Sequence, residues 1–194
     1  MVPPMRRTMI LILLSLSLAL SLGSLAPSAT ARDADRASQG LLITYQGWGK
    51  LHRGMTPKEA QRTGMVSTKL SGCAAGYQLT KPYAGRAYLT WNAAKKPWTV
   101  RWIIVIGSSD HTREGSHPGT TLAQLRHQHP YLSKVVRGGS LTGQVPSKVD
   151  VWVAWVKKPY GTITYHFPYG TRPTRASKVE SVVVSKHPVA YYGC

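Results

Sequence analysis

The chain has 194 residues, with 25 lysines and arginines against 7 aspartates and glutamates, and its formal net charge is +18 at pH 7. This surplus of cations favours anionic partners. With so few carboxylates, a catalytic site built from a pair of aspartates or glutamates has few candidate residues. The length suits one compact domain, or two half-size units that share a core.

The first 31 residues have the pattern of an export signal. Arg6 and Arg7 precede the apolar run MILILLSLSLALSLGSL, and the small residues SATA follow at 28–31. This order is typical of a secretory signal peptide, so we expect residues 1–31 to be removed and the mature protein to be secreted into the extracellular space. A membrane anchor is the alternative interpretation, although no basic stop-transfer cluster follows the run. After cleavage, no further stretch is apolar for long enough to span a bilayer.

Residues 32–44 begin with the polar run RDADRASQG, and we interpret them as a flexible lead-in. Two similar helix starts follow. In 53–64, Thr56 is the expected N-cap, with Pro57 at the first helical position and Glu59 three residues after the cap. In 118–130, the cap is Thr121, Gln124 stands in the equivalent place, and Pro130 ends the helix. Both patterns predict a capping box.

Five runs rich in valine, isoleucine, threonine and aromatic residues have the composition of strands. They are GRAYLTW (85–91), WTVRWIIVI (98–106), VDVWVAWV (149–156), YGTITYHF (160–167) and KVESVVVS (178–185). A helix followed by strands, stated twice, predicts an α+β fold with an internal repeat, and we place a first unit at 45–112 and a second at 113–194.

Four short motifs suggest a relationship to known proteins. They are Gly54-Met55-Thr56, the stretch Gly-Cys-x-x-Gly-Tyr at 72–77, the second Gly-Thr-Thr start at 119–121, and the closing YYGC. Together they resemble a group of secreted bacterial tandem-repeat proteins of unassigned role, whose organisation is similar to the β-lactamase inhibitory protein fold. The resemblance spans residues 45–194. It implies two tandem helix-plus-antiparallel-sheet units that form one concave sheet.

The resemblance also implies a binding module rather than an enzyme. This chain departs from the inhibitor in having two cysteines and few acidic residues, and the acidic loop through which the inhibitor contacts its enzyme has no counterpart that we can locate. Likeness of fold therefore supports a binding role and gives little support to β-lactamase inhibition itself.

The motif Lys-Lys-Pro-aromatic occurs twice, at Lys95–Lys96 and at Lys157–Lys158. Proline suits the first central position of a tight turn, while the lysines stay in water. We expect the four lysines to attract an anionic partner over long range. The alternative is that they are solvated hairpin tips, whose charge discourages aggregation through strand edges.

Strand alternation predicts which side chains form an open face of the sheet. In 98–106 we place Arg101 on the side opposite Trp98, Trp102 and Ile104, and in 149–156 we place Trp152 opposite Val151 and Val153. Aromatic residues interleaved with cations suit ligand contact. The predicted ligand-binding residues are Arg86, Tyr88, Arg101, Trp152, Thr164 and His166.

The sequence therefore predicts a secreted, non-catalytic, inhibitor-like binding module with no cofactor, whose partner is an extracellular protein or an anionic polymer of the cell envelope. An envelope-associated polyanion-binding protein is the first alternative. A metal-dependent hydrolase, with a site of Asp110, His117 and His127, is the second. The oligomeric state is left open.

The two cysteines, Cys73 and Cys194, generate a prediction about the mature protein. An even pair in an oxidising compartment is most simply one disulfide. Closing so long a loop stabilises the folded state by about 4–5 kcal/mol in the chain-entropy account. Mass spectrometry of the non-reduced, alkylated secreted protein is expected to show no modified thiol, and two alkylated cysteines would refute the disulfide.

Overall fold

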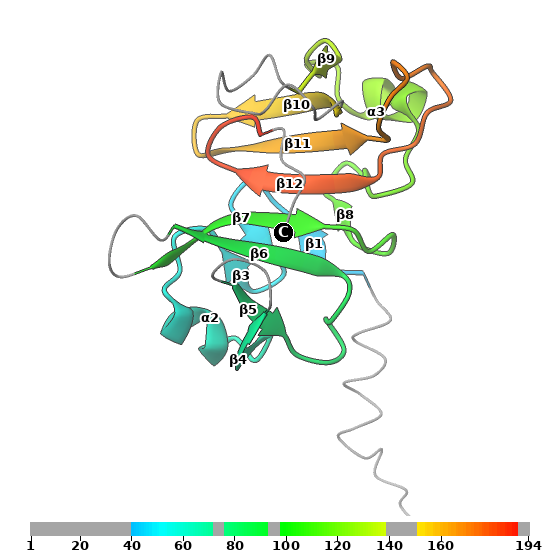
Figure 1. Cartoon of the computed structure of the whole chain (residues 1–194). Helices are drawn as coiled ribbons and strands as arrows, with labels where there is room; N and C mark the ends of the chain where they lie inside the picture. Colours follow the sequence, from blue (N-terminus) through cyan, green and yellow to red (C-terminus); the bar gives the residue numbers. More distant parts are fainter. Residues whose placement is uncertain (1–39, 72–75, 93–97, 139–150, 190–194) are drawn as a thin grey trace, which may run out of the picture.

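The computed structural model describes residues 40–71, 76–92, 98–138 and 151–189. In these residues the chain forms three sheets and two short helices, and the strands of the largest sheet are stacked from the top to the middle of the view in Figure 1. No helix in the described ranges has the length and apolar character needed to cross a membrane.

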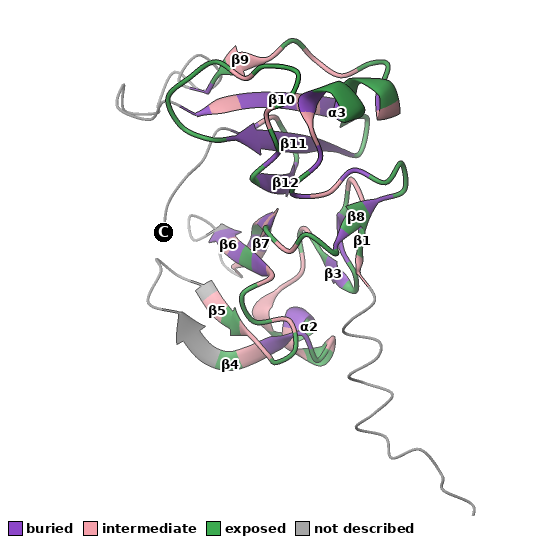
Figure 2. Cartoon of the chain, turned by 90° about the vertical axis from the view of Figure 1, so that its right-hand side faces the viewer, coloured by how far each residue is buried: buried purple, intermediate pink, exposed green. Residues whose placement is uncertain are grey.

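The largest sheet has six strands in the order β6-β7-β12-β11-β10-β9, and the neighbouring strands are antiparallel. The strands are β6 (Ala87–Asn92), β7 (Thr99–Val105), β9 (Val136–Arg137), β10 (Trp152–Lys158), β11 (Gly161–Phe167) and β12 (Ser181–Ser185). Valines and isoleucines from its central strands form much of the core. Both β11 and β12 are buried along their whole length (Figure 2).

Two smaller sheets complete the strands. The first has the order β3-β2-β1-β8 and comprises β1 (Leu42–Ile43), β2 (Gly47–Trp48), β3 (Leu51–His52) and β8 (His111–Thr112). The second pairs β4 (Val66–Ser71) with β5 (Gly76–Leu79). Ile43, Trp48 and Leu51 are buried and belong to the same core cluster as the valines of β12, so the first small sheet packs against the large one.

Both predicted capping boxes are confirmed. Helix α2 (Pro57–Arg62) begins after Thr56, whose side chain accepts from the Glu59 amide while the Glu59 carboxylate accepts from the Thr56 amide. Helix α3 (Leu122–Gln128) begins after Thr121 with the same reciprocal bonds to Gln124. Each box satisfies backbone donors that a helix start otherwise leaves free.

The predicted fold class is wrong. The described residues do not form two helix-plus-sheet units with one concave sheet: they are mostly strand, in three separate sheets. With six and seven residues, α2 and α3 are too short to cover a sheet face. The large sheet contains strands from both expected units, 45–112 and 113–194, because β7 pairs with β12. Leu42 and Ile43, assigned to the lead-in, form β1.

A β-bulge at Arg101 changes the predicted alternation of β7. Thr90 pairs with Trp102, yet the next residue of β6, Trp91, pairs with Val100, so Arg101 is the extra residue. As a result, Val100 is buried on the core side together with Ile103 and Val105. A regular strand, in which side chains alternate without interruption, would instead place Ile103 and Val105 on the side of Arg101.

Trp152 lies on the core side of β10 instead of on an open face. It packs against the main core with Ala154 and Val156, while Val151 and Val153 form a smaller cluster of their own. Its indole Nε1 donates to the carbonyl oxygen of Gly170 at 3.0 Å. The prediction failed because both sides of this strand are apolar, and alternation alone cannot choose between two apolar sides.

Substitution of Trp152 by alanine should therefore lower the free energy of unfolding, by about 2–3 kcal/mol for a partly buried tryptophan. Urea unfolding of the purified variant measures this change. Tyr131→Ala is the control, because Tyr131 is 89% exposed and its loss should be nearly neutral. A loss below about 0.5 kcal/mol at Trp152 would contradict its place in the core.

Candidate functional site

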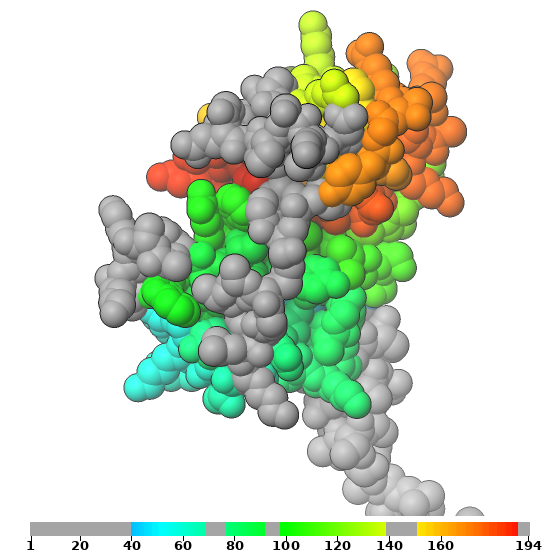
Figure 3. Space-filling view, in the orientation of Figure 1, coloured from blue at the N-terminus to red at the C-terminus, as the bar shows by residue number. Residues whose placement is uncertain are grey.

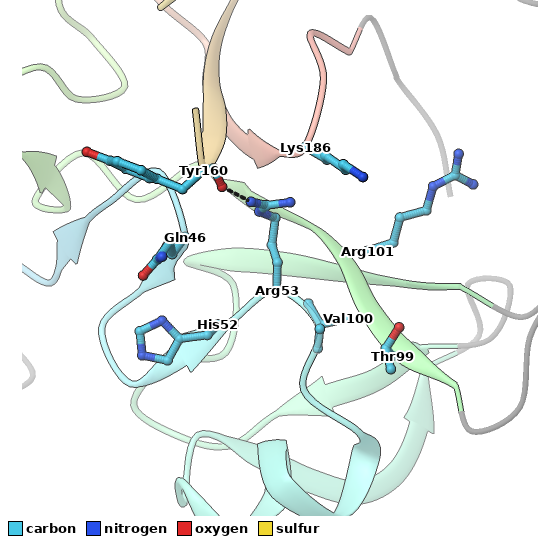
Figure 4. Close-up of a pocket in the computed structure, with 9 residues that line it drawn as sticks. Gln46, His52, Arg53, Thr99, Val100, Arg101, Tyr160 and Lys186 are labelled. Atoms are coloured by element: carbon cyan, nitrogen blue, oxygen red, sulfur yellow. Dashed lines mark hydrogen bonds between the residues drawn. The ribbon is translucent and has the colours of Figure 1, made fainter. Parts of the chain in front are cut away.

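A cavity of about 510 Å³ opens at one end of the large sheet, where that sheet meets β2 and β3 (Figure 4). The residues that line it come from the β1–β2 turn, the end of β3 and the segment after it, the start of β7, the β10–β11 turn and the residue after β12. They are Gln46, His52, Arg53, Gly54, Thr99, Val100, Arg101, Tyr160 and Lys186.

The register of the large sheet brings Arg101 and Lys186 together. Val184 of β12 pairs with Ile103 of β7 in an antiparallel ladder, so Lys186, two residues after Val184, and Arg101, two residues before Ile103, lie toward the same end of the sheet. Both residues line the cavity. The space-filling view shows the end of β12 (red) against the green residues of the β6–β7 region (Figure 3). Both side chains are exposed and both are positively charged.

Backbone hydrogen bonds place Arg53 next to this pair. The Gly54 amide donates to the Val100 carbonyl at 2.8 Å, and the Val100 amide donates to the Met55 carbonyl at 2.8 Å. Gly54 has a φ of +87°, a conformation that glycine adopts without strain, so the chain turns sharply after Arg53. The segment after β3 therefore runs along the start of β7, with Arg53 at the edge of the cavity.

The Arg53 side chain joins the two sheets. Its Nη2 donates to the backbone carbonyl of Tyr160 at 2.7 Å and to that of Tyr45 at 3.4 Å. Burial lowers the pKa of this guanidinium, which nevertheless keeps its charge at neutral pH. Its partners here are neutral carbonyl dipoles, so the positive charge is positioned without being neutralised.

Gly161 allows this close contact. A Cβ at that position would lie 2.1 Å from the Tyr45 carbonyl oxygen and 2.8 Å from Arg53 Nη2. Any larger residue would therefore push the β10–β11 turn away from Arg53. Glycine is the residue that fits where two backbones approach so closely.

The lining of the cavity is strongly basic. Arg53, Arg101 and Lys186 carry positive charges, and no aspartate or glutamate is among the lining residues. The Arg101 guanidinium also stacks on the Trp102 ring, 4.5 Å from its centroid, which supports the side chain at the rim. Near the site, burial first, and then the charge of Glu114, raise the pKa of Tyr45, whose backbone carbonyl accepts from Arg53, to about 12.

The structure does not bring the six predicted ligand-binding residues together. Arg101 lines the cavity, whereas Tyr88 is on the edge strand β6 and is 50% exposed. Arg86 forms an ion pair with the buried Asp110. Thr164 and His166 are fully buried, so the expectation that they lie on an open face is wrong. The reason is that β11 is covered on both of its sides.

The other predicted residues divide into two groups. Lys157 and Lys158 are exposed at the end of β10, as expected of a hairpin tip. Lys95, Lys96, Cys73 and Cys194 lie outside the described residues.

Two other groups of polar residues could in principle carry chemistry: Asp110 of the metal hypothesis, and a buried cluster around His129. Asp110, the carboxylate of the metal hypothesis, accepts from Arg86 and from the Leu41 amide, and the described residues contain no group of three potential ligands that could hold a metal ion. A buried polar cluster places His129 Nε2 2.8 Å from both Ser116 Oγ and the Tyr165 hydroxyl. These groups satisfy one another inside the core.

Sequence reasoning missed Arg53, Lys186 and Tyr160. Arg53 and Tyr160 are 107 positions apart in the sequence, and only folding brings them to the distance of a hydrogen bond. The one available signal was local: Arg53 directly precedes Gly54, at a turn before a helix cap.

Comparison with known proteins adds little to this geometry. No family model matches the sequence, and no curated protein matches it either. The crystal structure of the uncharacterized protein yfeY from Escherichia coli is similar to the chain with a TM-score of 0.45 and 15% sequence identity, over 74% of this chain and 99% of that chain. This likeness is too weak to indicate a function.

The burial of His166 generates a prediction about stability. Burial lowers its pKa to about 4, against the opposing effect of its hydrogen bond to the Val189 carbonyl. The unfolded chain takes up this proton near pH 6.5 and the folded chain only near pH 4, so the free energy of unfolding should fall as the pH drops through that window, by about 3 kcal/mol.

Urea unfolding at several pH values between 7 and 4 measures this effect, with His166→Gln as the comparison. The variant should be less stable at pH 7 and should lose less stability on acidification. A remaining slope is expected from His129, whose pKa burial also lowers. Parallel pH profiles for the two proteins would contradict the assignment.

Proposed function

We propose that this protein is a non-catalytic binding module that holds an anionic ligand in the cavity of Arg53, Arg101 and Lys186. The observation that carries the proposal is the convergence of three cations from separate segments on one cavity that has no carboxylate in its lining. Like charges brought together in this way repel one another, and a bound anion relieves that repulsion. The choice of a binding role over a catalytic one follows from the same residues, which offer charge and hydrogen-bond donors rather than a nucleophile with its base.

The remaining charges favour the same ligand. Of the described carboxylates, Glu59 is used by the cap of α2 and Asp110 by the ion pair with Arg86. With 25 lysines and arginines against 7 aspartates and glutamates in the whole sequence, most positive charges are not balanced by a negative one, and the field of so basic a chain attracts anions from a distance. Lys157 and Lys158 are exposed at the end of β10, next to the turn that contributes Tyr160 to the cavity. We propose that they increase the rate at which the anion associates with the protein.

Partial burial should make Arg53 the strongest contact. A hydrogen bond from a charged donor is worth more where water is partly excluded, and Arg53 is partly buried while Arg101 and Lys186 are exposed. The bonds from Arg53 to the Tyr45 and Tyr160 carbonyls also fix its position before a ligand arrives. Preorganisation of this kind reduces the entropy lost on binding.

We further propose that the ligand is met outside the cell. The support is the signal-peptide pattern of residues 1–31, which predicts export. Anionic polymers of the cell envelope and released phosphate compounds are the ligand sources that this location offers. This proposal replaces the sheet face as the contact surface, because Trp152, Thr164 and His166 are not on it.

The test uses inorganic tripolyphosphate, an anion with no organic part, and isothermal titration calorimetry. The double variant Arg101→Gln/Lys186→Gln should bind it about tenfold more weakly than the unmodified protein and with a smaller dependence on salt. The control Arg172→Gln/Arg175→Gln removes the same charge from exposed residues beyond the other end of β11. It should change the affinity less than about twofold.

Equal weakening by the two double variants would show that the anion is held by the overall charge and not by the cavity. No measurable binding to the unmodified protein at low salt would overturn the proposed function itself.

A further inference from the structure

The cavity has two chemically different halves. Arg53 lies in the middle, and Arg101 and Lys186 lie on one side of it (Figure 4). On the other side are the ring of Tyr160 and the side chains of Gln46 and His52, which extend away from the cationic residues. A small inorganic anion would contact the cationic half and leave the other half empty.

Tyr160 is held in place in spite of its exposure. It is 56% exposed, at the tip of the β10–β11 turn. Its ring packs edge to face against Tyr45, with centroids 5.9 Å apart and planes at 85°, and its carbonyl accepts from Arg53 at 2.7 Å. The ring is therefore oriented, with much of its surface still open. Tyr160 lines the cavity, and an exposed aromatic ring held at the edge of a basic cavity is suited to stacking against a planar ligand group.

The size and the polar groups of the site fit a ligand larger than a phosphate. A volume of about 510 Å³ falls within the range of small-molecule sites in proteins. The Gln46 amide can both donate and accept on the edge of a heterocycle, and the Thr99 hydroxyl can do the same to a sugar. Glutamine amides are suited to the donor and acceptor pattern at the edge of a nucleobase.

We propose that the ligand is a nucleotide, with its phosphates on Arg53, Lys186 and Arg101 and its base against Tyr160 and Gln46. This inference rests on the proposed function, since it identifies the anion bound by Arg53, Arg101 and Lys186 as the phosphates of a nucleotide. It adds that the base joined to those phosphates lies in the other half of the cavity. The nucleotide is either free or a unit of a single strand, because both present the same phosphate and base.

Calorimetry in buffer without divalent cations compares inorganic tripolyphosphate, ribose 5-phosphate, ATP and a short single-stranded deoxyadenosine oligonucleotide. ATP should bind at least about tenfold more tightly than tripolyphosphate, because stacking and base contacts are added to the same number of phosphates. Ribose 5-phosphate, which has no base, should bind more weakly than ATP. Tighter binding of the oligonucleotide than of ATP would identify a strand as the source, and the reverse would identify the free nucleotide.

Tyr160→Leu and Tyr160→Phe form a matched pair of variants. Leucine keeps apolar bulk without a flat ring and should remove most of the advantage of ATP over tripolyphosphate, whereas phenylalanine should retain it. Neither substitution alters the backbone carbonyl that Arg53 binds, so tripolyphosphate affinity should be unchanged in both. That unchanged affinity also shows that the variants are folded.

The two proposals fail in different ways. If ATP and tripolyphosphate bind the unmodified protein equally, or if Tyr160→Leu keeps the preference for ATP, the nucleotide assignment is overturned and the anion-binding function stands. If none of the four compounds binds, both are overturned.

Discussion

Antiparallel pairing of β7 with β12 is the constraint on which the rest of the described structure depends. It joins segments whose paired residues, such as Val105 and Val182, are far apart in the sequence, and it makes one six-stranded sheet out of the β6–β7 hairpin and the four strands β9 to β12. The paired residues Ile103 and Val184 are fully buried, so the ladder is fixed by hydrophobic packing as well as by hydrogen bonds. The same register brings Arg101 and Lys186 to one end of the sheet, where both line the cavity. A slip of one residue would exchange the two sides of β12 and change which of its valines face the main core.

Arg53 provides the second connection, between the large sheet and the β1–β2–β3 segment. Its bonds to the Tyr45 and Tyr160 carbonyls hold the β10–β11 turn against the small sheet, and Gly161 removes the side chain that would block this approach. A carboxylate in place of either carbonyl would form a salt bridge with Arg53 and neutralise its charge. Carbonyl dipoles orient the guanidinium and leave its charge available, which is the arrangement expected of a preorganised anion site.

The distribution of the few acidic residues supports this interpretation. Glu59 completes a helix cap, and Asp110 is buried against Arg86 and the Leu41 amide. Both have structural roles at a distance from the cavity lining, so the fold uses carboxylates where backbone donors or a buried cation need them. The basic residues at the end of the large sheet remain without acidic partners among the lining residues of the cavity. Three of the basic residues therefore meet in a cavity that has no carboxylate in its lining.

The sequence by itself determined the features that depend on neighbours within about four residues. The capping boxes at Thr56 and Thr121 and the approximate positions of β6, β7, β10, β11 and β12 follow from local hydrogen bonds and residue preferences. The tertiary structure alone decided the sheet order, the core side of Trp152, the burial of Thr164 and His166, and the meeting of Arg53 with Tyr160. The bulge at Arg101 shows the reason: one extra residue, set by pairing with a partner strand, reverses the side of every residue that follows, and alternation along a single strand contains no information about that partner.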